Sequence, residues 1–291
     1  MFYVVILGIP GVLIPFPHTD MVNLWNTLLL YPFVNLLIAI DRVTGNLGWS
    51  IIFLTLGLRL LMTPLVLPSL RLSKKVQELA PELAKIKAQY KDDKTALMNA
   101  QTALYKQHGA NPASGCLPQI LQLVILIALY TAMNTVLSSH GSSTIAHLNT
   151  ILYSFNQLPA HFNFSTQFAY LNLNQPDTFK IPGLALPLPG AFLILAAVVQ
   201  LISSKMMVPV VAKEKQVAAK TSESMDDAMV QAQEQMLYLF PLMTLVIGYR
   251  FPSGLVLYWF VFSFISMFQQ YSVTGWGGLR PWLKSAHLLK S

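Results

Sequence analysis

Charged side chains are scarce in this sequence. Asp, Glu, Lys and Arg make up 11% of its 291 residues, whereas a soluble domain carries about 25%. Hydrophobic residues make up 54%, and the mean hydropathy is +0.52. Because so little charge cannot cover the surface of an ordinary soluble domain, the composition predicts an integral membrane protein.

Cysteine is almost missing, since Cys116 is the single one. This excludes an intrachain disulfide and any metal or iron–sulfur site built from several cysteines. We expect Cys116 to be a small packed thiol near a membrane boundary. The six histidines lie outside the predicted spans and at no metal-ligand spacing. Motifs of zinc proteases, serine hydrolases and P-loop proteins are also missing, so we expect no enzyme, cofactor, metal or bound nucleotide.

One charged residue, Arg59, lies inside an apolar segment, where a charge raises the free energy of membrane insertion. Arg59 lies in the middle of the apolar run Trp49–Ser69, with nine residues before it from Ser50 and ten after it. In a helix rising about 1.5 Å per residue, this places the guanidinium near the bilayer midplane, at a cost of roughly 2.5–3.5 kcal/mol. An arginine cannot lose its proton, and no Asp or Glu lies inside another apolar segment. Snorkelling and ion pairing are the alternatives, but we expect a hydrated, functional Arg59.

The distribution of apolar runs predicts the organisation of the chain. We expect an all-α integral membrane protein with a core of five transmembrane helices, an amphipathic surface helix before them and a cytoplasmic antiparallel helical hairpin. Pro32 divides the apolar stretch before residue 46 and favours a surface helix over a span. The predicted segments are an N-terminal apolar segment with an extracytoplasmic interfacial helix (1–46), the spans (47–70, 117–138, 186–208, 236–251 and 254–273), the cytoplasmic hairpin (71–112), an extracytoplasmic loop (139–185), a cytoplasmic loop (209–235) and a cytoplasmic basic tail (274–291).

The hairpin is predicted from a heptad pattern. Apolar residues recur there at alternating spacings of four and three, which is typical of a helix that packs against a partner helix. Asp93 can cap a second helix running to about His108, and we expect Pro81 to kink the first arm. The heptad residues are Leu72, Val76, Leu79, Leu83, Ile86 and Tyr90.

Positive charge predicts the orientation. Residues 71–112, 205–235 and 275–291 hold most of the 19 Lys and Arg residues, and such segments stay in the cytoplasm. The N-terminus is then outside, and the hairpin and the C-terminus are cytoplasmic.

Polar residues inside the predicted spans indicate a shared cavity. Thr55 lies one helical turn before Arg59, and further polar positions occur in three other spans. Each alone is typical of interhelical hydrogen bonding, but together with an unpaired arginine they predict a polar cavity that opens to the cytoplasm. These further residues are Gln119 and Gln122, Gln200, Ser203 and Ser204, and the stripe Trp259, Ser263, Ser266 and Gln270.

Three motifs resemble those of the YidC/Oxa-type membrane protein insertases, in their shorter form without the large periplasmic domain. The resemblance covers roughly Tyr31 to Tyr271, and the order and spacing of the motifs make it specific. The motifs are Gly48–Ile52 with Thr55–Pro64, Leu104–Lys106 with Asn111–Pro118, and Phe251–Trp259 with Gln269–Tyr271.

This resemblance implies a multi-pass protein of the bacterial plasma membrane that inserts nascent membrane proteins without ATP. Arg59 would line a hydrophilic groove open to the cytoplasm and the lipid. Thr55, Tyr258 and Trp259 match groove positions, Gln200 lies where the third span faces the groove, and Ser263 joins them from the polar stripe. The implied partners are nascent membrane proteins, the lipid bilayer, and the ribosome, signal recognition particle or its receptor, and Sec translocon. The short basic tail does not favour strong ribosome tethering.

Two other functions remain open at this point. A small-anion or lipid-headgroup transporter could use Arg59 as a counter-charge, but no inverted repeat or pair of broken helices is visible in the sequence. A structural assembly factor would pack Arg59 in a dry contact, which the lack of an acidic partner does not favour.

Overall fold

The computed structural model describes residues 19–90, 93–109, 117–138, 142–183, 187–207, 238–239 and 241–286. They are mostly helical, as predicted. Within these residues, three helical stretches are long and apolar enough to cross a membrane, namely Val22–Thr44, Leu47–Leu79 and Ser253–Thr274. Leu121–Leu137 and Ala191–Met206 are shorter apolar helices. A helical membrane protein is therefore confirmed, whereas the number of spans stays a prediction.

The chain begins with α1 (Thr19–Trp25), which continues through the π-helical turn Asn26–Leu30 into α2 (Tyr31–Thr44). The expectation that Pro32 divides this stretch is wrong. Pro32 follows directly after the π-helical turn Asn26–Leu30, and the backbone stays helical through it although proline supplies no N–H group. Val22–Thr44 is consequently long enough for a span, although we predicted a surface helix. α2 ends at Gly45, whose φ of +66° is a left-handed conformation that glycine adopts without strain.

The predicted first span and the first arm of the hairpin form one continuous helix, α3 (Leu47–Gln89), of 43 residues. Pro81 lies inside this helix and does not end it. α4 (Lys94–Gln107) follows, and the Asp93 side chain caps it by accepting a hydrogen bond of 2.9 Å from the backbone N of Ala96.

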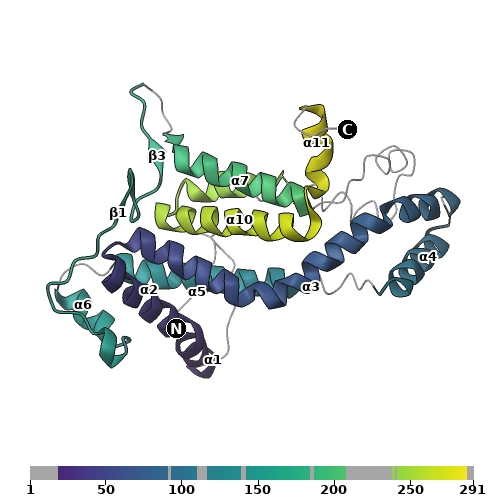
Figure 1. Ribbon diagram of the computed structural model, residues 1–291. Coiled ribbons are helices and arrows are strands. Elements are labelled where there is room, and N and C mark those ends of the chain that lie inside the picture. Colours follow the sequence, from purple (N-terminus) through teal and green to yellow (C-terminus); the bar gives the residue numbers. More distant parts are fainter. Residues whose placement is uncertain are drawn as a thin grey trace.

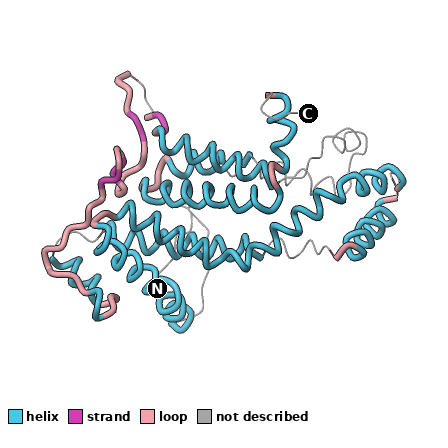
Figure 2. Tube along the Cα trace, in the orientation of Figure 1, coloured by secondary structure: helices cyan, strands magenta, loops and turns pink. Residues whose placement is uncertain are grey.

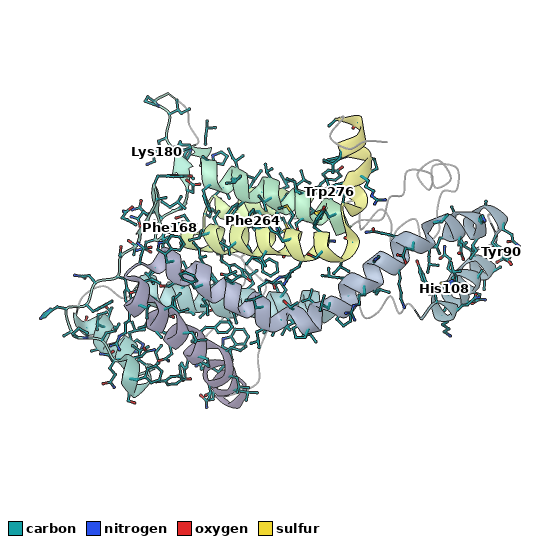
Figure 3. All side chains as sticks on the ribbon, viewed as in Figure 1. Tyr90, His108, Phe168, Lys180, Phe264 and Trp276 are labelled. Carbon is teal, nitrogen blue, oxygen red and sulfur yellow. The ribbon has the colours of Figure 1, made fainter. Side chains whose placement is uncertain are left out.

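α4 turns back along the end of α3. Leu79 and Leu83 of α3 pack against Leu104 of α4, and Lys75 Nζ donates to the carbonyl oxygen of His108 at 3.2 Å. In Figure 3, Tyr90 lies at the far tip of this pair while His108 lies nearer the main bundle. The described residues therefore place α4 antiparallel to the end of α3.

The main bundle contains α5 (Leu117–Leu137), α7 (Ala191–Met207) and α10 (Ser253–Thr274) beside α2 and α3. α10 packs against both α7 and α3, and α2 packs against both α3 and α5. Figure 1 shows these helices running roughly parallel to one another. Residues 241–248 are also helical. The predicted fourth span (236–251) lies partly outside the described residues, and the loop 209–235 lies wholly outside them. The central core residues include Leu37, Ile38, Ile51, Leu129, Ala132, Leu257 and Tyr258.

The segment between α5 and α7 gathers at one end of the bundle (Figure 2). It contains α6 (Ser142–Asn149) and two antiparallel ladders, β1 (Gln167–Phe168) with β2 (Leu171–Asn172) and β3 (Thr178–Phe179) with β4 (Leu188–Pro189). The prediction of an all-α fold missed these strands, because two residues are too few to show an alternating pattern.

Hydrogen bonds fasten this segment to α2. Arg42 Nη1 and Nη2 donate to the carbonyl oxygens of Phe155 and Gln157 at 2.6 and 2.5 Å. Arg42 is thus engaged by the segment that covers the bundle end. The predicted basic tail begins with a 3₁₀ turn, Gly277–Leu279, and α11 (Arg280–Ser285).

Candidate functional site

The interior arginine of α3 is the centre of the candidate site. Arg59 is 9% exposed, and its guanidinium carbon lies 4.4 Å from the centroid of the Phe262 ring of α10. A cation above an aromatic face is attracted by the ring quadrupole. Arg59 Nε is buried and has no hydrogen-bond partner among the described residues. The Phe262 ring therefore stabilises the positive charge of Arg59, but the Nε–H donor of Arg59 is left without a hydrogen bond in the described part of the chain.

α5 and α10 meet beside this arginine. Tyr258 lies one helical turn before Phe262 on α10, and the two ring centroids are 5.9 Å apart. The Tyr258 hydroxyl accepts a hydrogen bond of 2.6 Å from Gln122 Nε2 of α5. Three helices, far apart in the sequence, thus contribute the aromatic and polar groups around Arg59.

A second polar contact joins α3 and α10 one turn after Arg59. Thr63 Oγ1 donates to the carbonyl oxygen of Arg59 at 2.8 Å and accepts from Gln269 Nε2 at 2.7 Å. Gln269 Oε1 and Gln270 Nε2 are buried without a hydrogen-bond partner in the part of the chain that the structure describes.

Such unpaired atoms are unusual inside a protein. Leaving a buried polar group without a partner costs about 1–3 kcal/mol, so most are bonded to protein or water. Arg59 Nε and Gln269 Oε1 supply a donor and an acceptor where α3 and α10 meet. This boundary can therefore hydrogen-bond water or a polar ligand.

The other predicted site residues divide into two groups. Thr55 and Ser263 are buried on α3 and α10, and Thr55 Oγ1 donates to its own helix at Ile51. Trp259 is partly buried against the main core. Gln200 Oε1 of α7 instead accepts a hydrogen bond from Thr244 Oγ1. The structure thus unites Arg59 with Tyr258 and Gln122, while Gln200 bonds to residues 241–248.

Thr63 and Gln269 lie inside the sequence motifs but were not predicted as site residues, and Phe262 lies outside those motifs. Phe262 follows Tyr258 by four residues and Thr63 follows Arg59 by four, so each continues a helical face that already carried a predicted site residue. This spacing was the signal that could have found them. In the described part of the chain, no group of three His, Cys, Asp or Glu residues could hold a metal ion.

Fold and site together define a helical membrane protein with an incompletely paired arginine in the interior of its bundle. The profile of the family described as "60Kd inner membrane protein" matches residues 39–276, and the chain therefore belongs to this family. Membership confirms the resemblance seen in the motifs, a multi-pass location in the bacterial membrane, and a protein that is not an enzyme.

Curated relatives cover most of the chain. It is 32% identical over 238 residues to the membrane protein insertase YidC of Fusobacterium nucleatum. This match covers 82% of this chain and 91% of the relative. It is 30% identical over 263 residues to the membrane protein insertase MisCA of Bacillus subtilis, covering 88% of this chain and 81% of the relative. The YidC of Syntrophobacter fumaroxidans is 28% identical over 249 residues, and the match covers 86% of this chain but 38% of that longer protein.

Proposed function

We propose that this protein is an ATP-independent insertase and chaperone for membrane proteins. It receives segments of nascent membrane proteins in a hydrophilic groove beside Arg59 and releases them laterally into the lipid. The observation that carries the proposal is the buried Arg59, whose guanidinium carbon lies over the Phe262 ring and whose Nε is unpaired among the described residues. The names of the curated relatives, membrane protein insertases, support the same reading.

The capture step uses charge and hydrogen bonding. A polar segment that precedes a substrate's transmembrane helix must leave bulk water to cross the membrane. A hydrated site within the bilayer shortens that path, and Arg59 attracts Asp or Glu residues of the segment. The unpaired amide oxygen of Gln269 can accept a hydrogen bond from the same segment.

The release step needs no nucleotide. Each Leu, Ile, Phe or Val of the substrate's own helix gains about 0.3–0.6 kcal/mol on entering the bilayer. A segment of 20 such residues therefore supplies the driving force for its own lateral exit, and the protein only has to lower the barrier for the polar part.

The proposal includes an orientation and partners. The spans 47–70, 117–138, 186–208, 236–251 and 254–273 cross the bilayer with the N-terminus outside. The groove opens to the cytoplasm and the lipid. The end of α3 and α4 project into the cytoplasm, where their basic surface can meet the ribosome, the signal recognition particle or its receptor. Work beside the Sec translocon is part of the same proposal.

The competing function is a small-anion or lipid-headgroup transporter. It would use Arg59 in the same way, but it gives no role to the helical pair of α4 and the end of α3, which is joined by Leu79, Leu83 and Leu104. The insertase uses this pair as a platform outside the bilayer.

A crosslinking scan on ribosome-bound nascent membrane proteins tests the proposal. Photo-reactive residues at Tyr258, Trp259 and Gln200 should crosslink to the nascent segment. Matched positions on the exposed face of α10, at Phe264 and Phe268, should crosslink mainly to lipid. Crosslinks confined to the exposed positions would exclude a substrate groove, and transport of a small anion without nascent-chain crosslinks would favour the transporter.

A further inference from the structure

Two large apolar side chains face outward beside the start of α7. Phe179 of β3 and Leu188 of β4 are direct partners in the ladder, and they are 48% and 43% exposed. Cross-strand partners project from the same face of a ladder. Ile181, which follows β3, is also exposed. We call residues 178–183 and 187–189 the finger.

The base of the finger is fixed to the first turn of α7. Asp177 Oδ2 accepts hydrogen bonds from the backbone N of Leu193 at 2.9 Å and from the Tyr170 hydroxyl at 3.2 Å. The backbone N of Gly190 donates to the carbonyl oxygen of Asp177 at 2.7 Å. A Cβ on Gly190 would collide with Asp177 Oδ1, so only glycine permits this close approach.

The second strand has a tether of its own. The Tyr249 hydroxyl donates to the carbonyl oxygen of Pro187, directly before β4. The first strand is therefore fastened to α7, and the second to the turn that follows the helical residues 241–248. The outward position of Phe179 and Leu188 is consequently set by the fold and is not the result of a loose loop.

The finger points away from the bundle. Figure 1 shows β3 leaving the end of the bundle where α7 begins and extending sideways past α7, across the direction of the helices. Lys180, labelled in Figure 3, lies on this projecting segment. The adjoining flank of α7 exposes Ile194, Leu195 and Val198, so apolar side chains continue from the helix surface to the finger.

We propose that the finger rests on the outer leaflet of the membrane, with Phe179 and Leu188 in the boundary between headgroups and acyl chains and Lys180 at the lipid phosphates. The inference depends on the proposed function only in placing α7 as a span whose start faces outward. Aromatic side chains favour this boundary, and a lysine can extend its ammonium group from apolar surroundings to the phosphates.

The lipid surface fits these residues better than a protein partner does. Lys180 is the single Lys or Arg between Lys106 and Lys205, and one cation beside a small apolar patch matches an interfacial anchor. The sideways direction carries the finger off the bundle at the level of the first turn of α7. In the proposed arrangement, lipid headgroups surround the protein at that level.

Site-directed spin labelling tests this inference. In a Cys116→Ser background, Phe179→Cys and Leu188→Cys are labelled and reconstituted into vesicles of phosphatidylethanolamine and phosphatidylglycerol. Power saturation then compares access of oxygen, which concentrates in lipid, with access of a water-soluble nickel complex. Asn163→Cys, on an exposed loop position, serves as the water control, and Val198→Cys as the lipid control.

At both finger positions we expect oxygen access to exceed nickel access, with values between those of the two controls. Nickel access equal to that of Asn163→Cys would overturn the inference, and so would shielding from both reagents, which would indicate a protein contact. If Val198→Cys itself is open to nickel, the spanning arrangement of the proposed function fails. If Val198→Cys lies in lipid while Phe179→Cys lies in water, only the finger inference fails.

The tether provides a second measurement. Asp177→Ala removes the bonds to Leu193 and Tyr170, so a label at Phe179→Cys should become more mobile and lose at least half of its protection from the nickel complex. Unchanged mobility would contradict the role of Asp177 in holding the finger on the membrane.

Discussion

The guanidinium of Arg59 lies over the ring of Phe262, with 4.4 Å between the guanidinium carbon and the ring centroid. An acidic partner would accept hydrogen bonds from the N–H groups of the guanidinium. An aromatic ring attracts the cation through the face of the ring and accepts none of these bonds in the guanidinium plane. Nε is buried and unpaired among the described residues, so the contact with the ring leaves this N–H donor unsatisfied.

The first prediction concerns charge selectivity. Arg59→Ala should lower insertion of a substrate with one acidic residue in its translocated segment by about fivefold, since a unit-charge attraction at about 4 Å in water-like surroundings is worth about 1 kcal/mol. Arg59→Lys should retain part of the activity. Protease protection of the translocated segment in proteoliposomes measures the effect.

A substrate with an uncharged translocated segment is the control, and its insertion should change little. Thermal unfolding in detergent verifies that the variant is folded. Equal losses for the acidic and the uncharged substrate would show that Arg59 does not act through charge attraction.

The second prediction tests the contact between Arg59 and Phe262. A double-mutant cycle of Arg59→Met and Phe262→Leu should give a coupling free energy of about 1 kcal/mol, between the values for exposed and desolvated cation–π pairs. Reversible unfolding in mixed micelles provides the four free energies. Phe264→Leu, an exposed position on the same helix, should add to Arg59→Met within about 0.3 kcal/mol.

The third prediction concerns the bond between Gln122 and Tyr258. Tyr258→Phe removes the acceptor of Gln122 Nε2 and should destabilise the protein by about 1–2 kcal/mol, because a partly buried donor loses its partner. The double variant Tyr258→Phe with Gln122→Leu should recover most of that loss in the same unfolding measurement. If the destabilisations caused by Tyr258→Phe and by Gln122→Leu are simply additive in the double variant, the bond does not exist in solution.

The fourth prediction concerns the attachment of the segment between α5 and α7 to α2. Asn35 Nδ2 donates to the carbonyl oxygen of Ile151 at 3.1 Å, and Asn35 Oδ1 accepts from the backbone N of Tyr153 at 2.8 Å. Asn35→Ala should speed hydrogen exchange of the Tyr153 amide about fivefold or more, for a bond worth about 1 kcal/mol. The Leu173 amide, bonded to Thr166 at 2.8 Å, should be unaffected.

The centre of the site could be predicted from the sequence because its signals are local. An arginine in the middle of an apolar run is visible without any contact, and the polar stripe of α10 follows from helical spacing alone. The stacking of Phe262 on Arg59 could not be predicted, because it depends on which faces of α3 and α10 meet. An apolar ring in an apolar helix gives no sign of its partner.

The helices of the fold could also be predicted from local signals, but some of their boundaries could not. The end of the apolar run near Arg71 was interpreted as a boundary, yet α3 continues to Gln89. Helical backbone hydrogen bonds are made within the segment, so a helix can pass from lipid into water without interruption. Pro32 was interpreted as a break because its position in the first turn of α2 depends on the π-helical turn before it.

The prolines of α3 give that helix an uneven stiffness. Pro64 and Pro68 lie between Arg59 and the part of α3 that packs against α4, and each removes one backbone hydrogen bond. Bending of α3 is therefore easiest just past Arg59, on the side of α4. Gln89 is about 35 Å from these prolines along the axis, so a pivot of about 10° there moves the helix tip by about 6 Å. The outer part of α3 can thus change its direction while Arg59 keeps its place against Phe262.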